Sequence, residues 1–171
     1  MYTETLTLAN GVKIPQLGLG TWFIDDANAA EAVKAAAKLG YRHFDTAQAY
    51  GNERGVGEGV RSCGVAREEL FVVSKVAAEH KTYEAAKASI DATLQKMGLD
   101  YLDMMIIHSP QPWDKVNQCE DRYVEGNRAA WRALEEAYKE GKKMTTSCCP
   151  AFVNMIKKHF LQGIQVAVDG I

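Results

Sequence analysis

Four times along the chain, a short apolar run is followed by a longer segment with helical periodicity. The fourth run, YLDMMIIH, is almost continuously apolar after Asp103, which is typical of a strand covered on both faces. Repeated strand–helix units predict a parallel α/β sheet. The predicted strands are 16–22, 41–47, 70–76 and 101–108, and the helices that follow them are 27–39, 53–62, 82–97 and 128–140.

Ahead of these units, two short alternating runs, 4–8 and 12–14, flank the dipeptide Asn10-Gly11. Asn-Gly tolerates the positive φ angles of a tight hairpin turn better than other dipeptides do. The sequence therefore predicts an N-terminal β-hairpin.

The charge balance of the 171 residues is close to neutral, with 20 Lys and Arg against 22 Asp and Glu and a formal charge of −2. It gives no electrostatic reason to expect a nucleic acid or an anionic membrane as partner. No apolar stretch reaches the roughly 18 residues of a membrane span, and the polar start MYTETLTLANG lacks the features of a secretory signal, so we expect a cytoplasmic protein. The cysteines, which we expect to be reduced thiols, are Cys63, Cys119, Cys148 and Cys149.

Ionisable residues stand where the predicted strands end. Asp45 and Tyr50 follow the second run, Lys75 ends the third and His108 ends the fourth. The carboxyl ends of parallel strands share one edge of a sheet, where ligands bind, so we expect these side chains to converge. Taken singly, each has a structural explanation, because a strand-end lysine is usually solvated, a tyrosine packs and a histidine often bonds locally.

The connection 109–127 is long for such a unit, and such loops often carry function.

Together the four residues suit the protonation of an oxygen atom. A neighbouring aspartate lets a buried lysine stay charged, and a charged lysine lowers the pKa of an adjacent phenol. Tyr50 can then act as a general acid, while His108 hydrogen-bonds a substrate carbonyl and orients it. Reduction of that carbonyl to an alcohol needs a separate hydride donor.

The sequence resembles the aldo-keto reductases in a long N-terminal signature, GYRHFDTAQAYGNERGVG, at residues 40–57. Three shorter motifs also match, namely GLGTW (18–22), SK (74–75) and IHSP (107–110). The segments HSPQPW and EGNRAAWRALEEAYKEGK are most similar to bacterial members related to the 2,5-diketogluconate reductases. The resemblance covers about residues 1–142.

This resemblance implies a (β/α)8 TIM barrel in which a nicotinamide cofactor, usually NADPH, delivers hydride to an aldehyde or ketone while a tyrosine supplies the proton. It implies no metal ion. Carried over residue by residue, it gives the catalytic residues Asp45, Tyr50, Lys75 and His108, the cofactor-binding residues Gly20, Thr21, Trp22 and Asp45, and the substrate-contacting residues Trp22, Tyr50, His108 and Trp113. A tryptophan next to a proline, as Trp113 is, serves equally well as a loop anchor.

A full barrel needs about 250 residues. We therefore expect a truncated (β/α)8 barrel with about four βα units, an N-terminal hairpin and a divergent C-terminal helix. We assign residues 1–142 to this partial barrel and 143–171 to a divergent tail. The tail does not show the family's fifth strand, stacking aromatic residue or basic phosphate-binding loop, so we expect any cofactor affinity to be weak.

Within the tail, TSCCP and AFVNMIKKHF (146–160) are similar to a cluster-binding motif of the iron-only hydrogenases. One short motif cannot supply the four cysteine ligands that a cluster usually needs. The alternative for residues 151–160 is a helix that covers exposed strand edges. The change of resemblance near Lys142 suggests a truncated or recombined gene.

Four parallel strands leave two sheet edges and an apolar inner face that a closed barrel would cover, which favours association. A homodimer through the exposed sheet edges is one form that this association can take. The alternative to a working reductase is therefore a catalytically inactive truncated or chimeric half-barrel fragment that self-associates.

Overall fold

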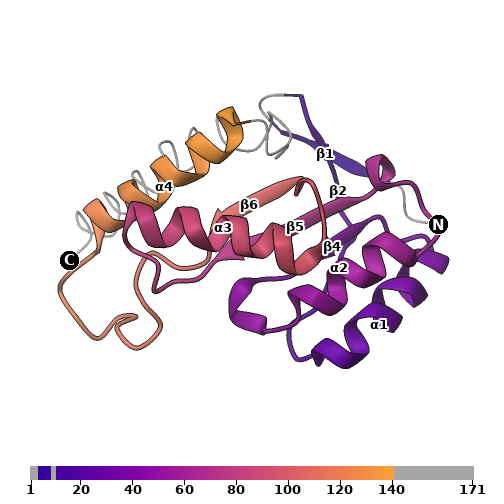
Figure 1. The fold of residues 1–171 in the computed structure, drawn as a ribbon, viewed down its shortest axis with the longest axis horizontal. Coiled ribbons are helices and arrows are strands. Elements are labelled where there is room, and N and C mark those ends of the chain that lie inside the picture. Colours follow the sequence, from indigo (N-terminus) through magenta and orange to yellow (C-terminus); the bar gives the residue numbers. More distant parts are fainter. Residues whose placement is uncertain (1–3, 9–10, 141–171) are drawn as a thin grey trace.

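The computed structural model of the chain describes residues 4–8 and 11–140 (Figure 1). Four parallel strands form a sheet in the order β3-β4-β5-β6, and two antiparallel strands form a separate hairpin. The strands are β1 (Thr5–Thr7), β2 (Lys13–Pro15), β3 (Leu19–Gly20), β4 (His43–Asp45), β5 (Phe71–Val76) and β6 (Met104–Ile107), and the α-helices are α1 (Asp26–Lys38), α2 (Glu53–Ser62), α3 (Tyr83–Met97) and α4 (Val124–Lys139). The predicted α/β class, with four βα units in series, is confirmed.

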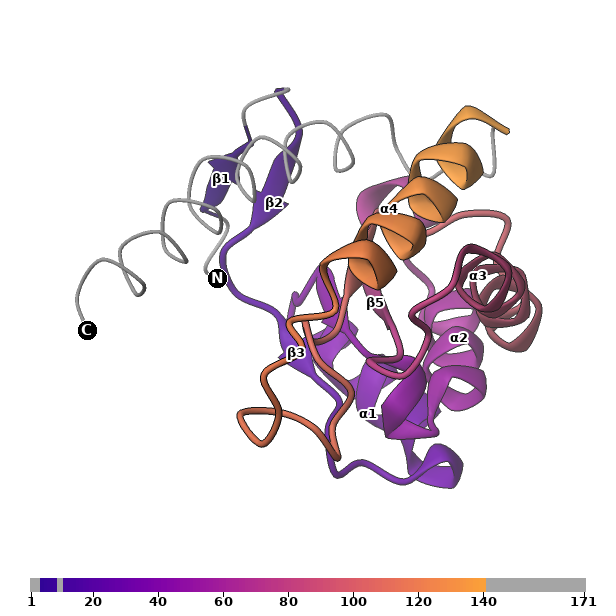
Figure 2. The same cartoon turned by 90° about the vertical axis from the view of Figure 1, so that its left-hand side faces the viewer.

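The helices cover one face of the parallel sheet, and each packs beside the next in chain order (Figure 2). The main core lies between the helices and the sheet. Gly57 allows α2 and α3 to approach closely, because a Cβ atom at this position would overlap the backbone of Met97. Fully buried side chains of this core include Phe44, Val72 and Val76 from the strands and Val33, Ile90 and Leu134 from the helices.

Strand β5 is buried on both faces, and its residues alternate between them. Val72 and Val76 belong to the core beneath the helices. Phe71 and Val73 form a second apolar cluster with residues of the β1–β2 region. Lys75 follows Val73 by two residues, so it shares the face of this second cluster and not that of the helices.

The predicted hairpin is confirmed. Leu6 pairs with Ile14 in an antiparallel register, and the backbone N–H of Leu8 donates to the carbonyl oxygen of Val12 at 2.8 Å. Gly11 has a φ angle of 87°, in the left-handed region that the Asn-Gly pattern predicts for this turn.

The predicted helices 27–39, 53–62 and 82–97 agree with α1, α2 and α3 to within one residue at each end. Helix α4 begins at Val124, earlier than the predicted start at residue 128. Its first turn contains Gly126, where a Cβ atom would lie 2.8 Å from the Cβ atom of Lys81. Tertiary packing of this turn therefore outweighs the low helix propensity of glycine.

The prediction of a buried strand over residues 16–22 is wrong in extent and in burial. Strand β3 contains only Leu19 and Gly20, and the Trp22 side chain beyond it is 65% exposed. Among the described residues, β3 pairs only with β4, so its other edge makes no hydrogen bonds to a neighbouring strand. The glycines of this run also leave few side chains to bury.

Three predictions concern residues outside the described part of the chain. They are the C-terminal helix, the boundary between residues 1–142 and 143–171, and the cysteine motif at 146–160.

Candidate active site

The carboxyl ends of the parallel strands place one lysine among three oxygen atoms. Nζ of Lys75 donates to Oδ2 of Asp45 at 2.6 Å, to the Thr46 carbonyl at 2.8 Å and to the Tyr50 hydroxyl at 3.4 Å. The Lys75 side chain is only 11% exposed and that of Asp45 34%. These three acceptors, one of them a carboxylate, offset the cost of burying the lysine nitrogen.

Tyr50 lies in a 3-10 turn, Gln48–Tyr50, between β4 and α2. The Gln48 side chain fixes this turn, since its amide donates to the Ser89 carbonyl at 3.1 Å and to the Thr93 hydroxyl at 3.0 Å, while its oxygen accepts the N–H of Ala77 at 2.8 Å. The turn is thus bonded to α3 and to the residue after β5. These contacts hold the phenol in reach of Lys75.

Asn52 is a buried residue that the sequence analysis did not single out. Its amide donates to the carbonyls of Thr21 and Ile24, both at 2.8 Å, and its oxygen accepts the Thr46 hydroxyl at 2.7 Å. One side chain therefore connects the loop after β3 to the end of β4. The sequence holds one indication of its role: Asn52 lies between Tyr50 and α2, where a short polar residue would ordinarily cap the helix. In the structure its side chain makes no capping bond, so it is available for these other contacts.

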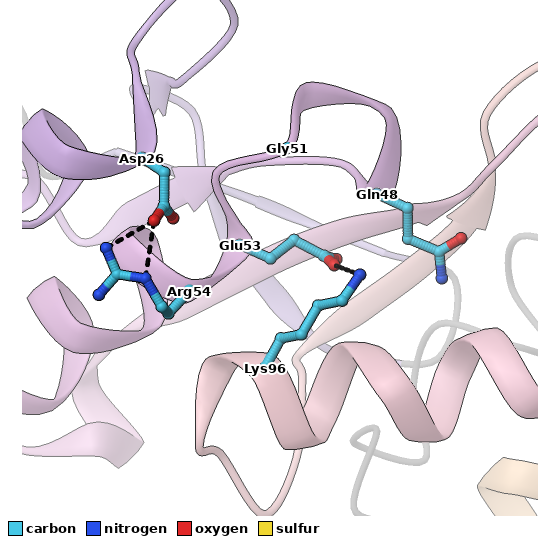
Figure 3. Close-up of a pocket in the computed structure, with 6 residues that line it drawn as sticks. All are labelled: Asp26, Gln48, Gly51, Glu53, Arg54 and Lys96. Carbon is cyan, nitrogen blue, oxygen red and sulfur yellow. Dashed lines mark hydrogen bonds and ion pairs between the residues drawn. The ribbon is translucent and has the colours of Figure 1, made fainter.

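Glu53 is the first residue of α2, on the face of the sheet that the helices cover, and is 3% exposed. Its Oε1 atom accepts the hydroxyls of Ser74 at 2.7 Å and Thr93 at 3.0 Å, and Lys96 lies 3.9 Å from Oε2. Ser74 and Lys75 point to opposite faces of β5, so Glu53 lies on the helix side of the sheet. The pocket of about 270 Å³ beside it (Figure 3) is thus separate from the Lys75 cluster and is lined by Asp26, Gln48, Gly51, Glu53, Arg54 and Lys96.

His108 directly follows β6, and its backbone N–H donates to the Val76 carbonyl at 3.0 Å. Its ring meets Tyr50 edge to face, with centroids 5.5 Å apart and an interplanar angle of 73°. Nδ1 is buried and has no hydrogen-bond partner among the residues that the structure describes. Burial, followed by the positive charge of Lys75, lowers the pKa of His108 below 6.5, whereas Asp45 and Glu79 act in the opposite direction. The shift therefore favours the neutral imidazole.

Aromatic side chains form a wall beside Tyr50 and His108. The Trp22 ring stacks toward Tyr50 at a centroid distance of 6.2 Å, and Phe23 stacks on Trp22 at 4.4 Å. On the other side, Trp113 meets His108 edge to face at 5.0 Å. Phe23 is 86% exposed and has a φ angle of 64°, and no pattern in the sequence pointed to it.

Thr21 and Gly20 lie beside Asp45 at the end of β3. Gly20 pairs with Asp45 in the parallel register. Thr21 is fully buried, and both its N–H and its hydroxyl donate to the Asp45 carbonyl at 3.0 Å. Thr21 thus positions the Asp45 backbone, while Trp22 is mostly exposed and the Asp45 side chain partly exposed.

The structure brings the predicted site residues together at one edge of the sheet. Asp45, Tyr50 and Lys75 share hydrogen bonds, and His108 joins them through its ring. Their catalytic roles stay predictions. Within the described ranges, no group of three or more His, Cys, Asp or Glu residues could hold a metal ion, and no helix is long and apolar enough to cross a membrane.

A parallel sheet with helices on one face and ionisable groups at the carboxyl ends of its strands is the arrangement of barrel-type α/β proteins. The chain belongs to the aldo/keto reductase family, whose model matches residues 16–158. It is 46% identical over 140 residues to the glyoxal reductase of Bacillus subtilis, covering 81% of this chain and 46% of the relative. It is 35% identical over 185 residues to the NADPH-dependent D-xylose reductase of Candida boidinii, covering 97% of this chain and 57% of the relative.

A solved structure of an aldo/keto reductase from Brucella melitensis has the same fold, with a TM-score of 0.71 and 38% identity over 83% of this chain and 50% of that one. The chain spans about half the length of the relatives it matches. The family match also runs past Lys142 into the segment that holds the cysteine motif. The iron–sulfur hypothesis for that segment gains no support from these relatives.

Proposed function

We propose that this chain reduces an aldehyde or ketone to an alcohol with NADPH, and that Tyr50 is the proton donor. The observation that carries the proposal is the bonding of the Lys75 ammonium to both Asp45 and Tyr50, with the His108 ring against the phenol. Two relatives support it by their names, one a glyoxal reductase and the other an NADPH-dependent D-xylose reductase.

The residues at the end of β3 fit a flat cofactor ring. A Cβ atom built on Gly20 meets no atom within 4 Å, so the space over the strand end is open. Gly20 pairs with Asp45, whose side chain is partly exposed, and Trp22, two residues further along the chain, is mostly exposed. We assign Gly20, Trp22 and Asp45 to contact with the nicotinamide, and Thr21 to holding Asp45. When bound, the nicotinamide supplies the hydride.

The protein's own residues handle the proton. Lys75 donates to the Tyr50 oxygen, which leaves the phenolic hydrogen free to bond the substrate carbonyl. A neutral imidazole carries one proton, and a buried N–H without a partner costs more than a buried lone pair, so the proton of His108 sits on Nε2 and not on Nδ1. Nε2 then donates a second hydrogen bond to the same carbonyl oxygen.

As hydride adds to the carbonyl carbon, the carbonyl oxygen takes the proton of Tyr50, and an alcohol results. Tyr50 is left as a phenolate beside the charged Lys75 and regains its proton from solvent. Trp22 and Trp113, on either side of the Tyr50–His108 pair, are the walls between which the substrate carbonyl enters.

The test compares Tyr50→Phe with Tyr101→Phe in reduction of glyoxal and D-xylose, followed by the loss of NADPH absorbance. Tyr101 precedes β6 at the opposite end of the sheet and serves as the control. Removing a general acid typically costs 10²- to 10⁴-fold in rate, so Tyr50→Phe should fall by about that factor and Tyr101→Phe by none. NADPH binding, measured by nucleotide fluorescence, should be equal in both. If Tyr50→Phe reduced the substrates as fast as the unmodified protein, Tyr50 would not be the proton donor.

A homodimer through the sheet edges is a second proposal. Within residues 4–8 and 11–140, β3 pairs only with β4 and β6 only with β5, which leaves a backbone edge on each outer strand. Light scattering on the purified chain tests it, and a monomer at micromolar concentration would rule it out. A cytoplasmic location is likewise part of the proposed function.

A further inference from the structure

The loop between β5 and α3, residues 77–82, bonds to the loop that carries Trp113. Nζ of Lys81 donates to the Ser109 carbonyl at 2.7 Å and to Oδ1 of Asn127 at 2.8 Å. Oε1 of Glu79 accepts the backbone N–H of Trp113 at 3.3 Å. Two neighbouring side chains thus hold both ends of residues 109–113.

The held segment begins immediately after His108. Inside it, the Ser109 hydroxyl donates to the Gln111 carbonyl at 2.7 Å, which closes a tight turn. The amide of Asn127 adds a bond to the Pro110 carbonyl at 2.8 Å. These bonds hold the backbone of Trp113 where its ring meets His108 edge to face.

Burying the ammonium group of Lys81 costs desolvation free energy, which only its hydrogen bonds can offset. The side chain is partly buried, and burial lowers its pKa from 10.5 to about 8 despite the opposing charge of Glu79. An apolar side chain would fill the same space against Gly126 without this desolvation cost. The ammonium group is therefore explained by its two acceptors, one in the loop and one at the start of α4.

We propose that Lys81 and Glu79 are positioning residues that set the substrate-facing wall of the site by holding Trp113 against His108. They act from a loop outside the catalytic cluster. The effect on carbonyl reduction rests on the proposed function, whereas the effect on Trp113 does not.

The experiment places 5-fluorotryptophan in the full chain and records ¹⁹F NMR spectra of Lys81→Met, Glu79→Ala and Glu79→Gln. The signal of Trp113 is assigned with Trp113→Phe, and Trp22 and Trp131 report on the remaining fold. Lys38→Met, at the exposed end of α1, is the matched control. Glu79→Gln keeps an oxygen acceptor for the Trp113 N–H and tests rescue.

We expect the Trp113 signal to shift or broaden in Lys81→Met and Glu79→Ala and to stay in place in Glu79→Gln and Lys38→Met. The signal of Trp22 should not change. In carbonyl reduction, KM should rise by about tenfold in the first two variants, the equivalent of one or two hydrogen bonds, with kcat nearly unchanged.

An unchanged Trp113 signal in folded Lys81→Met and Glu79→Ala would overturn the proposal, whether or not the chain turns over. If Lys81→Met fails to fold, the comparison of Glu79→Ala with Glu79→Gln tests the proposal by itself. A shift in both Glu79→Ala and Glu79→Gln would also contradict it, because the acceptor oxygen would then not be the cause.

Discussion

Replacing Asn52 by alanine is expected to lower the free energy of unfolding by about 3 kcal/mol, since it leaves buried groups without partners. The Thr46 hydroxyl loses its acceptor, and the Ile24 carbonyl loses its donor. The Thr21 carbonyl keeps one bond, because the Ile24 N–H also donates to it at 3.0 Å. Two groups at about 1–2 kcal/mol each, and one weakened bond, give the expected loss.

Urea unfolding followed by far-ultraviolet circular dichroism measures this loss, provided that the slope of the transition is the same in both proteins. Asn28→Ala is the matched control, since Asn28 is an exposed asparagine of α1, and it should change stability by less than about 0.5 kcal/mol. A domain of this kind has about 5–15 kcal/mol in total, so the loss at Asn52 is easily resolved.

The same substitution should loosen Trp22. Asn52 bonds to the carbonyls of Thr21 and Ile24, the two residues that flank the exposed pair Trp22 and Phe23. Acrylamide should therefore quench tryptophan fluorescence more strongly in Asn52→Ala than in Asn28→Ala. A loss of stability below about 1 kcal/mol, together with unchanged quenching, would refute the assignment of Asn52 as the link between the loop after β3 and the end of β4.

Two further substitutions, Lys75→Met and Gly57→Ala, and a titration of His108 test other parts of the structure. Lys75→Met should reduce carbonyl reduction by at least about 10²-fold and alter its pH dependence, because it removes the charge beside the phenol; an unaltered pH profile would count against the pairing with Tyr50. In NMR titration, the pKa of His108 should lie below 6.5 and rise in Lys75→Met, since the Lys75 charge is one cause of the lowering. Because the folded state disfavours the charged ring, the stability due to His108 should be present above about pH 6.5 and be lost as the pH falls below it. Gly57→Ala should destabilise by about 1–3 kcal/mol in thermal unfolding through overlap with Met97, although alanine favours a helix; a gain in stability would contradict this close approach.

Much of the fold could be predicted because its signals are local. The helix ends follow from single residues: Thr82 accepts the N–H of Ala85 at the start of α3, and Gly98, with a φ angle of 61°, ends it. Strand β3 could not be predicted in this way. Its pairing depends on β4, more than 20 residues away along the chain, and its exposure depends on which edge is paired.

The candidate site divides in the same way. Asp45, Lys75 and His108 could be found because parallel strands bring their carboxyl ends to one edge, whatever the details of packing. Gln48 and Lys81 could not, since their partners lie 28 to 46 residues away in loops and helices. The spacing of residues along the chain predicts which side chains share a face or an end of a regular element. It does not predict the hydrogen bonds by which one loop holds another.

The proposed acid–base cluster and the proposed cofactor surface share Asp45 but otherwise depend on different parts of the chain. Lys75 finds its acceptors on β4 and in the turn that follows it, and Gln48 fixes that turn to α3. All of these groups lie within the described residues, and none of the bonds between them uses a cofactor atom. Gly20 and Trp22, in contrast, stand at the outer strand β3, where Trp22 is mostly exposed. Weak NADPH binding would therefore leave the Lys75–Tyr50 pairing and the lowered pKa of His108 in place, so proton chemistry and cofactor binding can be measured separately in this chain.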